Sequence, residues 1–526
     1  MLRVRLACLV VALCCSSVFV RGQQQAPAPG SVYTIPVAIA GPNPALAVEE
    51  GLLFVPENRT KPGSRIISVH FLRLRGTSPG ARPPIFLLPG GPGGFFGREG
   101  LLSGPLRNEI DFLRASGRDV VIVNQRGNPA APFAAGMRWP LSARPLDEPS
   151  SESEYRTMVR KAVTEGLETW TKRGFDPSGY DILNITDDVN DLRKALGYSK
   201  IILRGGSFGS QWSFAFLKRY PRFVDRALMH GIEPLDYGYD SPAWLWAAIE
   251  RVSNLASQDA KLRPHLPAGG VSSALKTLLD RLGAAPQRVA ITDPRTGKEV
   301  NVTVGRLDLI QNLLYPFVTA PFTENLVKWP RFVLEMFKGD YRFLAALIWE
   351  GRTATSLPGM LGLLIDNSLG ITKGREAKLL AEPEQQWVGK VHPWYMDTRD
   401  LTTTPDVGDE FRADFDIQVP VVLLQGDVDF STPLENALHA KRFLRNGRLV
   451  VVEGGGTHSV QQEIFKFAPE VKTALQRFLT VDLDPMPADL FAGLPERVKL
   501  PPPAFEGLEG PSLYDRWLAN QRGGSR

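Results

Sequence analysis

The chain has 526 residues and a formal net charge of +5, and 43% of its residues are hydrophobic. This length allows about two to four domains of average size and a large apolar core. No block of lysines and arginines is interleaved with aromatic residues, which argues against nucleic acid as a partner. Beyond the N-terminus, no apolar run is long enough to span a membrane.

Residues 1–22 have the pattern of a secretory signal peptide. Arg3 and Arg5 form a basic start, residues 6–20 are apolar, and the small residue Gly22 fits a cleavage site. An uncleaved membrane anchor is the alternative, although the apolar stretch is shorter than the ~20 residues of a spanning helix. Cleavage would remove three arginines and all three cysteines, which lowers the net charge from +5 to +2 and leaves no disulfide. We therefore expect an exported protein, periplasmic or extracellular, without stable insertion in a membrane.

Residues 32–233 are predicted to form the first part of an α/β core, after a linker at 23–31 that is rich in Pro, Gln and Ala. Strand-like runs between turn residues favour two antiparallel strands within 33–75. Continuous apolar runs follow and return in the second part of the core, residues 416–480; such runs are typical of strands buried on both faces of a parallel sheet. Because they alternate with helical patterns, we predict an α/β fold with a mostly parallel sheet flanked by helices. The runs lie at 85–88, 120–123, 201–203, 227–229, 419–424 and 449–452.

Residues 234–415 interrupt this alternation. We interpret this segment as a mostly helical cap inserted over the active site; an independent domain is the alternative. One hairpin is expected within it, at 288–291 and 300–304. Residues 481–526 are rich in proline and are expected to extend over the surface. The helices predicted in the cap lie at 243–251, 272–282, 307–317, 325–337 and 341–349.

A G-x-S-x-G pattern, from Gly205 to Gly209, directly follows the apolar run at 201–203 and precedes a helical pattern. Glycine lets the backbone turn sharply between a strand and a helix. In α/β-hydrolases, a nucleophilic serine stands exposed above the sheet at such a junction. We therefore predict that Ser207 is the nucleophile; an ordinary turn serine is the alternative.

The general base and its acid are predicted from chain order, because α/β-hydrolases carry serine, acid and histidine in that order. His458 follows a predicted strand and a glycine-rich loop, from which a base can reach the serine. His439 lies in a helical pattern, and the other four histidines precede the candidate acids. Those candidates, Asp427 and Asp429, follow the strand expected at 419–424. We choose Asp429 to orient the base and interpret Asp427 as a turn former.

An oxyanion hole needs two backbone N–H groups that face the developing negative charge. Phe208, directly after the nucleophile, is the candidate for one donor. Gly91, in the glycine-rich loop at 88–94 after an earlier strand, is the candidate for the other. This loop is not a phosphate-binding loop, because no Gly-Lys-Ser/Thr follows it. No metal-binding motif such as H-E-x-x-H is present, so we expect neither a cofactor nor a metal.

Together these segments resemble the proline iminopeptidase and tripeptidyl aminopeptidase family of α/β-hydrolase serine peptidases. The resemblance covers about residues 50–235 and 415–480. It implies an α/β-hydrolase that cleaves short peptides from a free N-terminus, with acidic groups near the cap binding the amine. Glu233 and Asp236 are our candidates for that role, with Asp240 and Glu250 in the same cluster, although an acidic cluster is also typical of a solvated face. The matching motifs are Val55-Pro56, Pro62-Gly63, Gly90 to Gly94, Gln125-Arg126-Gly127, Asp191-Leu192-Arg193, Leu196-Gly197, Gly205 to Gly209, Gly426 to Asp429, Thr432-Pro433 and His458.

The chain departs from the family pattern in several places. Asn124 and Asn128-Pro129 replace an aspartate before Gln-Arg-Gly and a small turn after it, and Thr457 adds a residue before the histidine. The cysteines of the tripeptidyl branch are absent. A small carboxylic ester or a lactone is the alternative substrate, because fold and triad do not fix the leaving group. A binding protein on an inactive hydrolase fold is the third hypothesis. The oligomeric state is not predicted.

Overall fold

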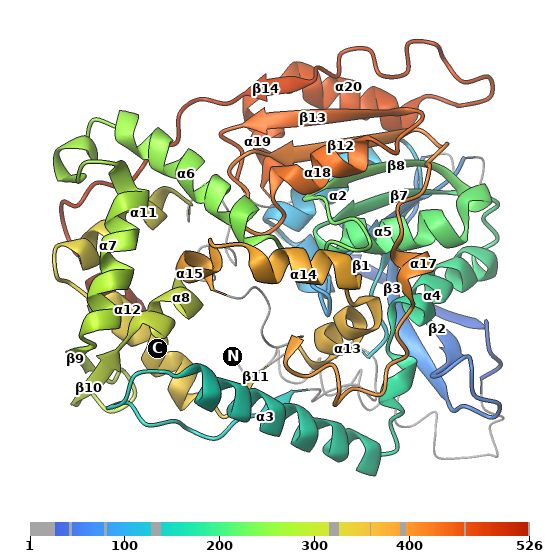
Figure 1. Ribbon diagram of the computed structural model, residues 1–526. Coiled ribbons are helices and arrows are strands. Elements are labelled where there is room, and N and C mark those ends of the chain that lie inside the picture. The colour runs from blue at the N-terminus through green and yellow to red at the C-terminus, as the bar shows by residue number, and fades with distance from the viewer. Residues whose placement is uncertain are drawn as a thin grey trace.

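The computed structural model describes residues 27–40, 45–77, 82–127, 138–314, 326–357, 359–389, 396–456 and 459–523 (Figure 1). The predicted signal peptide and His458 lie outside these residues. Among the helices that are described, none has both the length and the apolar character needed to cross a membrane.

A ten-stranded sheet forms the centre of the described chain, in the order β1-β2-β3-β5-β4-β7-β8-β12-β13-β14. From β5 to β14 every neighbouring pair is parallel, whereas β1, β2, β3 and β5 pair antiparallel. The mostly parallel sheet predicted from the apolar runs is therefore confirmed. The strands are β1 (Val32–Ile39), β2 (Leu46–Pro56), β3 (Ile66–Leu74), β4 (Ile85–Leu88), β5 (Val120–Val123), β7 (Ile201–Gly206), β8 (Val224–His230), β12 (Val421–Gly426), β13 (Gly447–Glu453) and β14 (Arg497–Lys499).

The two antiparallel strands predicted within residues 33–75 are present as β2 and β3, and the structure adds a third strand, β1, that was not predicted. β1 pairs with β2 from Val32 opposite Leu53 onwards, and β2 pairs with β3 from Glu49 opposite Arg73 onwards. β1 is an edge strand whose side chains are mostly exposed or half-buried. It therefore lacks the regular apolar alternation by which a strand is recognised in a sequence.

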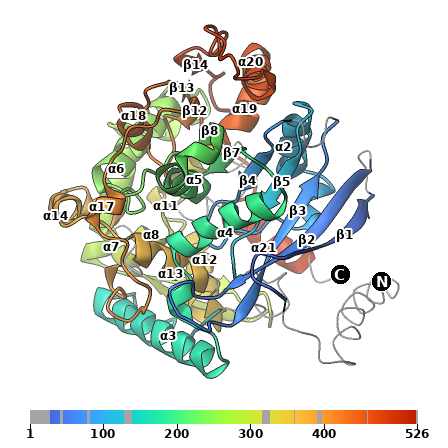
Figure 2. The ribbon, with the colours of Figure 1, turned by 90° about the vertical axis from the view of Figure 1, so that its right-hand side faces the viewer.

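The central strands are buried on both faces. Phe86 belongs to an apolar cluster that contains residues of α4, α5 and α18, whereas its neighbour Ile85 belongs to a second cluster, with residues of α2, α19 and α20, on the opposite face. Figure 2 shows α4 and α5 on one side of the sheet and α2 on the other. The apolar run of each strand thus supplies both layers of the core. The helices are α2 (Pro105–Arg114), α4 (Ile182–Ala195), α5 (Phe208–Arg219), α18 (Leu434–Lys441), α19 (Val460–Phe467) and α20 (Pro469–Thr480).

Between β8 and β12 the chain forms a largely helical region beside the sheet (Figure 1). This region has an apolar core of its own, in which Ile249, Leu278, Trp329 and Leu344 are buried. The predicted hairpin is present as β9 (Gln287–Thr292) and β10 (Glu299–Val304). A helical insertion between the strands of the sheet is therefore confirmed. Its helices are α6 (Pro242–Gln258), α7 (Gly270–Ala284), α8 (Arg306–Asn312), α11 (Trp329–Phe337), α12 (Arg342–Thr353), α13 (Met360–Leu369), α14 (Lys373–Ala381), α15 (Gln385–Val388) and α17 (Asp409–Arg412).

Segments outside this insertion also contact it. β6 (Trp139–Pro140) pairs with β11 (Ser356–Leu357) and leads to the long helix α3 (Glu152–Lys172), neither of which the sequence patterns predicted. In the proline-rich tail, β14 pairs with β13, and α21 (Leu513–Gly523) packs against α12. The tail therefore contributes an edge strand to the sheet and a helix to the insertion.

Candidate active site

Ser207 lies at the sharp turn between β7 and α5. Its φ is 57° and its ψ is −132°, and it is the only described residue other than glycine with a positive φ. Its N–H donates to the backbone oxygen of His230 at 3.0 Å. Backbone strain of this kind costs about 1–3 kcal/mol and concentrates at functional sites. The strand, serine and helix thus have the arrangement that the sequence predicted.

Gly205 and Gly209 make room for this turn. A Cβ on Gly205 would overlap the carbonyl oxygen of Gly209, and a Cβ on Gly209 would overlap that of Leu88. The backbones of β7, α5 and the end of β4 therefore approach more closely than larger residues would allow.

The glycine-rich loop after β4 passes close to Ser207. A Cβ on Gly90 would lie 3.3 Å from the Ser207 Cβ and 3.7 Å from its Oγ. Within the described residues, the N–H groups of Gly91 and Phe208 donate no hydrogen bond. Phe208 is the first residue of α5, where N–H groups lack helical partners and the helix dipole is positive. The two predicted oxyanion donors therefore belong to segments that meet at the serine.

Gln125 holds the loop that carries Gly91. Its Oε1 accepts a hydrogen bond from the Gly93 N–H at 2.7 Å. Its Nε2 donates to the carbonyl oxygens of Pro89 and Gly90 at 3.4 and 3.3 Å. The side chain is fully buried, so these bonds are shielded from competition with water.

Arg126, the next residue, is anchored by a buried ion pair. Its guanidinium donates to both carboxylate oxygens of Asp188 at 2.7 Å, and Arg59 lies 2.7 Å from the same carboxylate. Burial alone would raise the pKa of Asp188, but the charges and hydrogen bonds of Arg126 and Arg59 outweigh it and lower that pKa. The Gln-Arg-Gly motif thus has a structural reason, because Arg126 fixes the segment from which Gln125 holds the loop.

Asn124 supports the same loop. Its Oδ1 accepts from the Phe96 N–H at 2.9 Å, and its Nδ2 donates to the Phe96 oxygen at 3.0 Å and to His70 Nδ1 at 2.9 Å. Because Nδ1 accepts this bond, neutral His70 carries its proton on Nε2, which lies 2.9 Å from Glu50. An ionised aspartate could not donate to His70, so the amide is matched to this neighbour.

Asp429, the predicted acid, lies in the loop after β12 and is only 1% exposed. It accepts hydrogen bonds from the Ser431 and Thr432 N–H groups at 2.8 Å and from the Thr432 hydroxyl at 2.7 Å. Gln425 Nε2 donates to it at 3.2 Å. These donors fix the orientation of the carboxylate and stabilise its charge, as an acid that orients a base requires.

The loops that follow β12 and β13 lie side by side. The Val428 N–H donates to the Gly455 oxygen at 3.2 Å, and the Gly454 N–H donates to Asp427 Oδ1 at 2.8 Å. Burial raises the pKa of Asp427. The hydrogen bond that Asp427 accepts from Gly454 joins the two loops, which fits its interpretation as a residue that stabilises the turn. In the sequence His458 follows Gly456, but it lies outside the described residues, so its role stays a prediction.

Glu463 on α19 is a buried carboxyl that the sequence patterns did not mark. It accepts hydrogen bonds from the Gly456 N–H at 3.2 Å and from the Ser459 hydroxyl at 2.9 Å. Burial raises the pKa of Glu463 to about 7, and the charges of Asp429 and Asp427 add to this effect. Its ionisation therefore falls near neutral pH.

Glu233 follows β8 and is surrounded by other carboxyl groups. Its N–H donates to the Ser210 hydroxyl, in the first turn of α5, at 2.9 Å. Burial, followed by the negative charges of Asp240, Asp366 and Asp429, raises the pKa of Glu233 well above its ordinary value. Within the described residues, no group donates a hydrogen bond to its carboxylate. A cationic partner would stabilise the ionised form of this carboxyl.

Asp236, the other predicted amine-binding residue, is already paired. Its two carboxylate oxygens accept from the N–H and the hydroxyl of Thr372, both at 2.7 Å. Burial nevertheless raises the pKa of Asp236. These bonds connect the segment after β8 to the start of α14, so the Asp236 carboxylate is less available to a substrate than that of Glu233.

Two further carboxyl groups act on Glu233: Asp240, which the sequence placed in the same acidic cluster, and Asp366, which sequence reasoning missed. Asp366 lies on α13, far from Glu233 in sequence and outside any motif, so only the fold places them together. Helix α13 also contacts the glycine-rich loop that carries Gly91, since a Cβ on Gly362 would lie 2.9 Å from the Pro92 oxygen. One helix of the insertion therefore contacts this loop and carries a charge that acts on Glu233.

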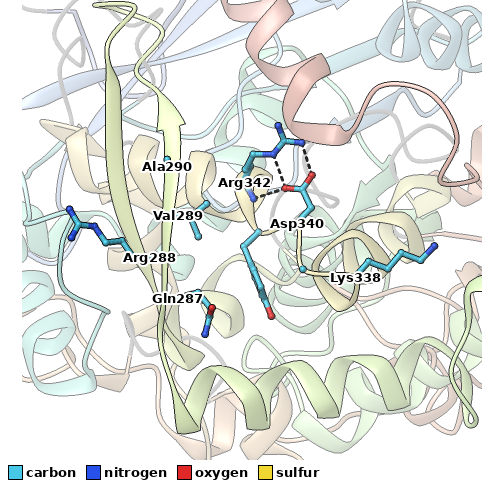
Figure 3. A pocket seen from close by; sticks show the side chains of 9 residues that line it. Gln287, Arg288, Val289, Ala290, Lys338, Asp340 and Arg342 are labelled. Atoms are coloured by element: carbon cyan, nitrogen blue, oxygen red, sulfur yellow. Dashed lines mark hydrogen bonds and ion pairs between the residues drawn. The ribbon is translucent and has the colours of Figure 1, made fainter.

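A cavity of about 660 Å³ lies elsewhere, in the helical insertion (Figure 3). Residues 287–290 of β9 and residues 338–342 between α11 and α12 line it. Arg342 donates to Asp340 at 2.7 Å at its edge. None of the predicted catalytic residues lines this cavity, so we do not assign it to the candidate active site.

Comparison with solved structures gives low similarity. A serine hydrolase from Cycloclasticus zankles is 13% identical, with a TM-score of 0.33 over 85% of this chain and 98% of that chain. Epoxide hydrolase A from Mycobacterium thermoresistibile is 14% identical, with a TM-score of 0.32 over 84% and 97%. A thermophilic esterase from Thermogutta terrifontis is 14% identical, with a TM-score of 0.30 over 81% and 97%. No curated protein matches the chain significantly.

Family models match both parts of the core. Residues 83–261 match the model described as alpha/beta hydrolase fold, and residues 398–478 match the model described as TAP-like protein. The first match contains Ser207 and the oxyanion loop, and the second contains Asp429 and residue 458. The resemblance inferred from the motifs is thus confirmed: the protein has the α/β-hydrolase fold with a TAP-like (tripeptidyl aminopeptidase-like) C-terminal domain.

Proposed function

We propose that the protein is an exported serine aminopeptidase that cleaves short peptides from a free N-terminus. The observation that carries this proposal is the carboxylate of Glu233, which has no hydrogen-bond donor among the described residues and is close enough to Asp429 for that charge to act on it. The backbone of Glu233 adjoins the serine turn, because its N–H donates to the Ser210 hydroxyl, which donates to the backbone oxygen of Ser207 at 2.7 Å. We place the substrate ammonium at this carboxylate.

In this mechanism Ser207 Oγ attacks the carbonyl carbon of the scissile bond while His458 takes the serine proton. The N–H groups of Gly91 and Phe208 stabilise the negative oxygen of the tetrahedral intermediate. Asp429 orients the imidazole and stabilises its charged form. The C–N bond then breaks, His458 gives the proton to the leaving amine, and an acyl-enzyme remains. Water attacks this ester by the same steps in reverse and releases the N-terminal fragment. No cofactor takes part.

The carboxyl groups around Glu233 make the reaction selective for a free N-terminus. An ammonium group favours the ionised form of Glu233, which burial and like charges otherwise disfavour. Asp240 and Asp366 add to the negative potential, and residues 234–415 act as the cap that encloses the substrate. An acetylated N-terminus has no charge and gains none of this attraction.

The test compares kcat/KM on a short peptide amide with its amine free and with that amine acetylated. We expect a strong loss on acetylation, and no turnover by Ser207→Ala with either peptide. If neither peptide is cleaved while a simple ester or lactone is, and Ser207→Ala abolishes that activity, the enzyme is a carboxylesterase or lactonase. N-terminal sequencing of the exported protein tests the signal peptide, because cleavage after Gly22 would leave Gln23 first.

A further inference from the structure

His230 contacts the nucleophile turn in two ways. Its backbone oxygen accepts the Ser207 N–H at 3.0 Å, and it stands opposite Gly206 in the pairing of β7 with β8. Its imidazole packs over Gly206, where an added Cβ would overlap three atoms of the ring. The ring therefore lies directly against the residue that precedes the serine. Chain order makes His458 the predicted general base, because His230 precedes the candidate acids, so we assign this placement another role.

Arg204 fixes the orientation of that ring. Its guanidinium is fully buried and donates to His230 Nδ1 at 2.8 Å. It also donates to Glu109 of α2 at 2.7 Å, to the Gly205 oxygen at 2.9 Å and to Gln461 of α19. A buried arginine with these partners cannot move without leaving several groups unsatisfied. The imidazole is thus attached to a rigid centre between α2, the sheet and α19.

The Arg204 contact also fixes the tautomer of the neutral His230 ring. An arginine side chain has only donors, so Nδ1 accepts and the ring hydrogen lies on Nε2.

We propose that Arg204 and His230 are positioning residues that hold Ser207 in its strained, reactive conformation. A strained residue persists only where its surroundings determine it from several sides. Here the Ser207 N–H is held by the His230 backbone, while the His230 ring, held by Arg204, packs against Gly206. Without this pair the turn relaxes, and only a fraction of molecules presents the serine correctly. The catalytic part of this inference rests on the proposed role of Ser207.

The test uses two substitutions of His230 and a matched arginine pair. His230→Asn keeps an acceptor near the Nδ1 position, whereas His230→Leu removes it and leaves the buried Arg204 without this partner. Arg204→Lys tests the arginine. Arg226→Lys is its control, because Arg226 on β8 is also buried but bonds to backbone oxygens at the end of α20. The readouts are the rate at which a serine-directed phosphonate labels Ser207, the KM for peptide, and the Ser207 φ in crystal structures.

We expect labelling of His230→Leu to be about 5- to 100-fold slower, with KM unchanged and a relaxed Ser207 φ. His230→Asn should recover most of the rate, and Arg226→Lys should label like the wild type. Labelling of His230→Leu at the wild-type rate, or a Ser207 φ that remains near +57° in that variant, would overturn the inference. If the wild type itself is not labelled at Ser207, the proposed function fails, while the crystallographic φ still decides whether the pair holds the turn.

Discussion

The proposed amine-binding role of Glu233 gives a sharp prediction for Glu233→Gln. Within the described residues the Glu233 carboxylate accepts no hydrogen bond, so a substrate ammonium would be its first donor. A hydrogen bond between charged groups contributes about 1.5–3 kcal/mol, which corresponds to about 10- to 150-fold in kcat/KM. Asp240 and Asp366 remain in the variant, so we expect the lower part of this range. The loss should affect the free-amine peptide and spare the acetylated one.

The pH dependence of the same variant follows from the raised pKa of Glu233. As pH falls through that pKa, the wild-type carboxylate is protonated and loses its attraction for ammonium, so its preference for the free amine should weaken. The variant should not show this dependence. The variant should also be more stable than the wild type at pH 8. Folding raises the pKa of the Glu233 carboxyl, so the wild-type protein loses folding stability as this carboxyl ionises with rising pH, and glutamine does not ionise.

The assay is the ratio of kcat/KM for the free and acetylated peptides, measured between pH 5 and pH 8. Asp236→Asn is the matched control, because the Asp236 carboxylate already accepts two hydrogen bonds from Thr372. The ratio measured for this variant should remain near the wild-type value. Equal losses on both peptides in Glu233→Gln, or an unchanged ratio, would refute the reasoning.

Three further substitutions test the supports of the site. Asp188→Asn removes the charged partner of the buried Arg126 and should lower the free energy of unfolding in urea by about 3–5 kcal/mol. The loss should be smaller at low pH, where the wild-type carboxylate is also protonated. Unchanged stability would refute the ion pair. The pKa of the Glu463 carboxyl is raised to about 7, so the thermal stability of the wild type should fall by up to about 3 kcal/mol as pH rises from 4.5 to 7. Glu463→Gln should not show this fall; parallel curves of stability against pH for the two proteins would contradict that. In Gly362→Ala the added Cβ should displace the loop that carries Gly91 and lower kcat. The control Gly374→Ala adds a Cβ that meets no neighbour and should leave kcat unchanged. Equal kcat in both variants would count against the contact of α13 with the loop.

The turn at Ser207 could be predicted because its signal is local. The apolar run of β7, the flanking glycines and the following helix are contiguous, and each is required by backbone geometry. β4 and β5 match their predicted bounds for a similar reason, since strands buried on both faces are continuous apolar runs.

Other features could not be predicted because their signals are not local. The predicted strand at 201–203 stopped before Arg204, since a charged residue ends an apolar run, yet the fold buries Arg204 beside Glu109 and His230. The helical pattern before β7 starts only at Thr186 in the sequence, yet helix α4 begins at Ile182, because Asp181 caps it by accepting a hydrogen bond from the Asn184 N–H at 2.7 Å. Asp366 belongs to no sequence motif, and only the fold brings its charge close to Glu233.

The most direct test of the account is to locate the covalent adduct of a serine-directed phosphonate by peptide mapping and mass spectrometry. We predict a single adduct on Ser207, absent in Ser207→Ala and retained in Ser210→Ala. Ser210 is the matched control, because its hydroxyl is engaged with the backbone oxygens of Ser207 in the same turn and of Gly231 after β8. No adduct on the wild-type protein, or an adduct that persists in Ser207→Ala, would contradict the claim that Ser207 is the nucleophile.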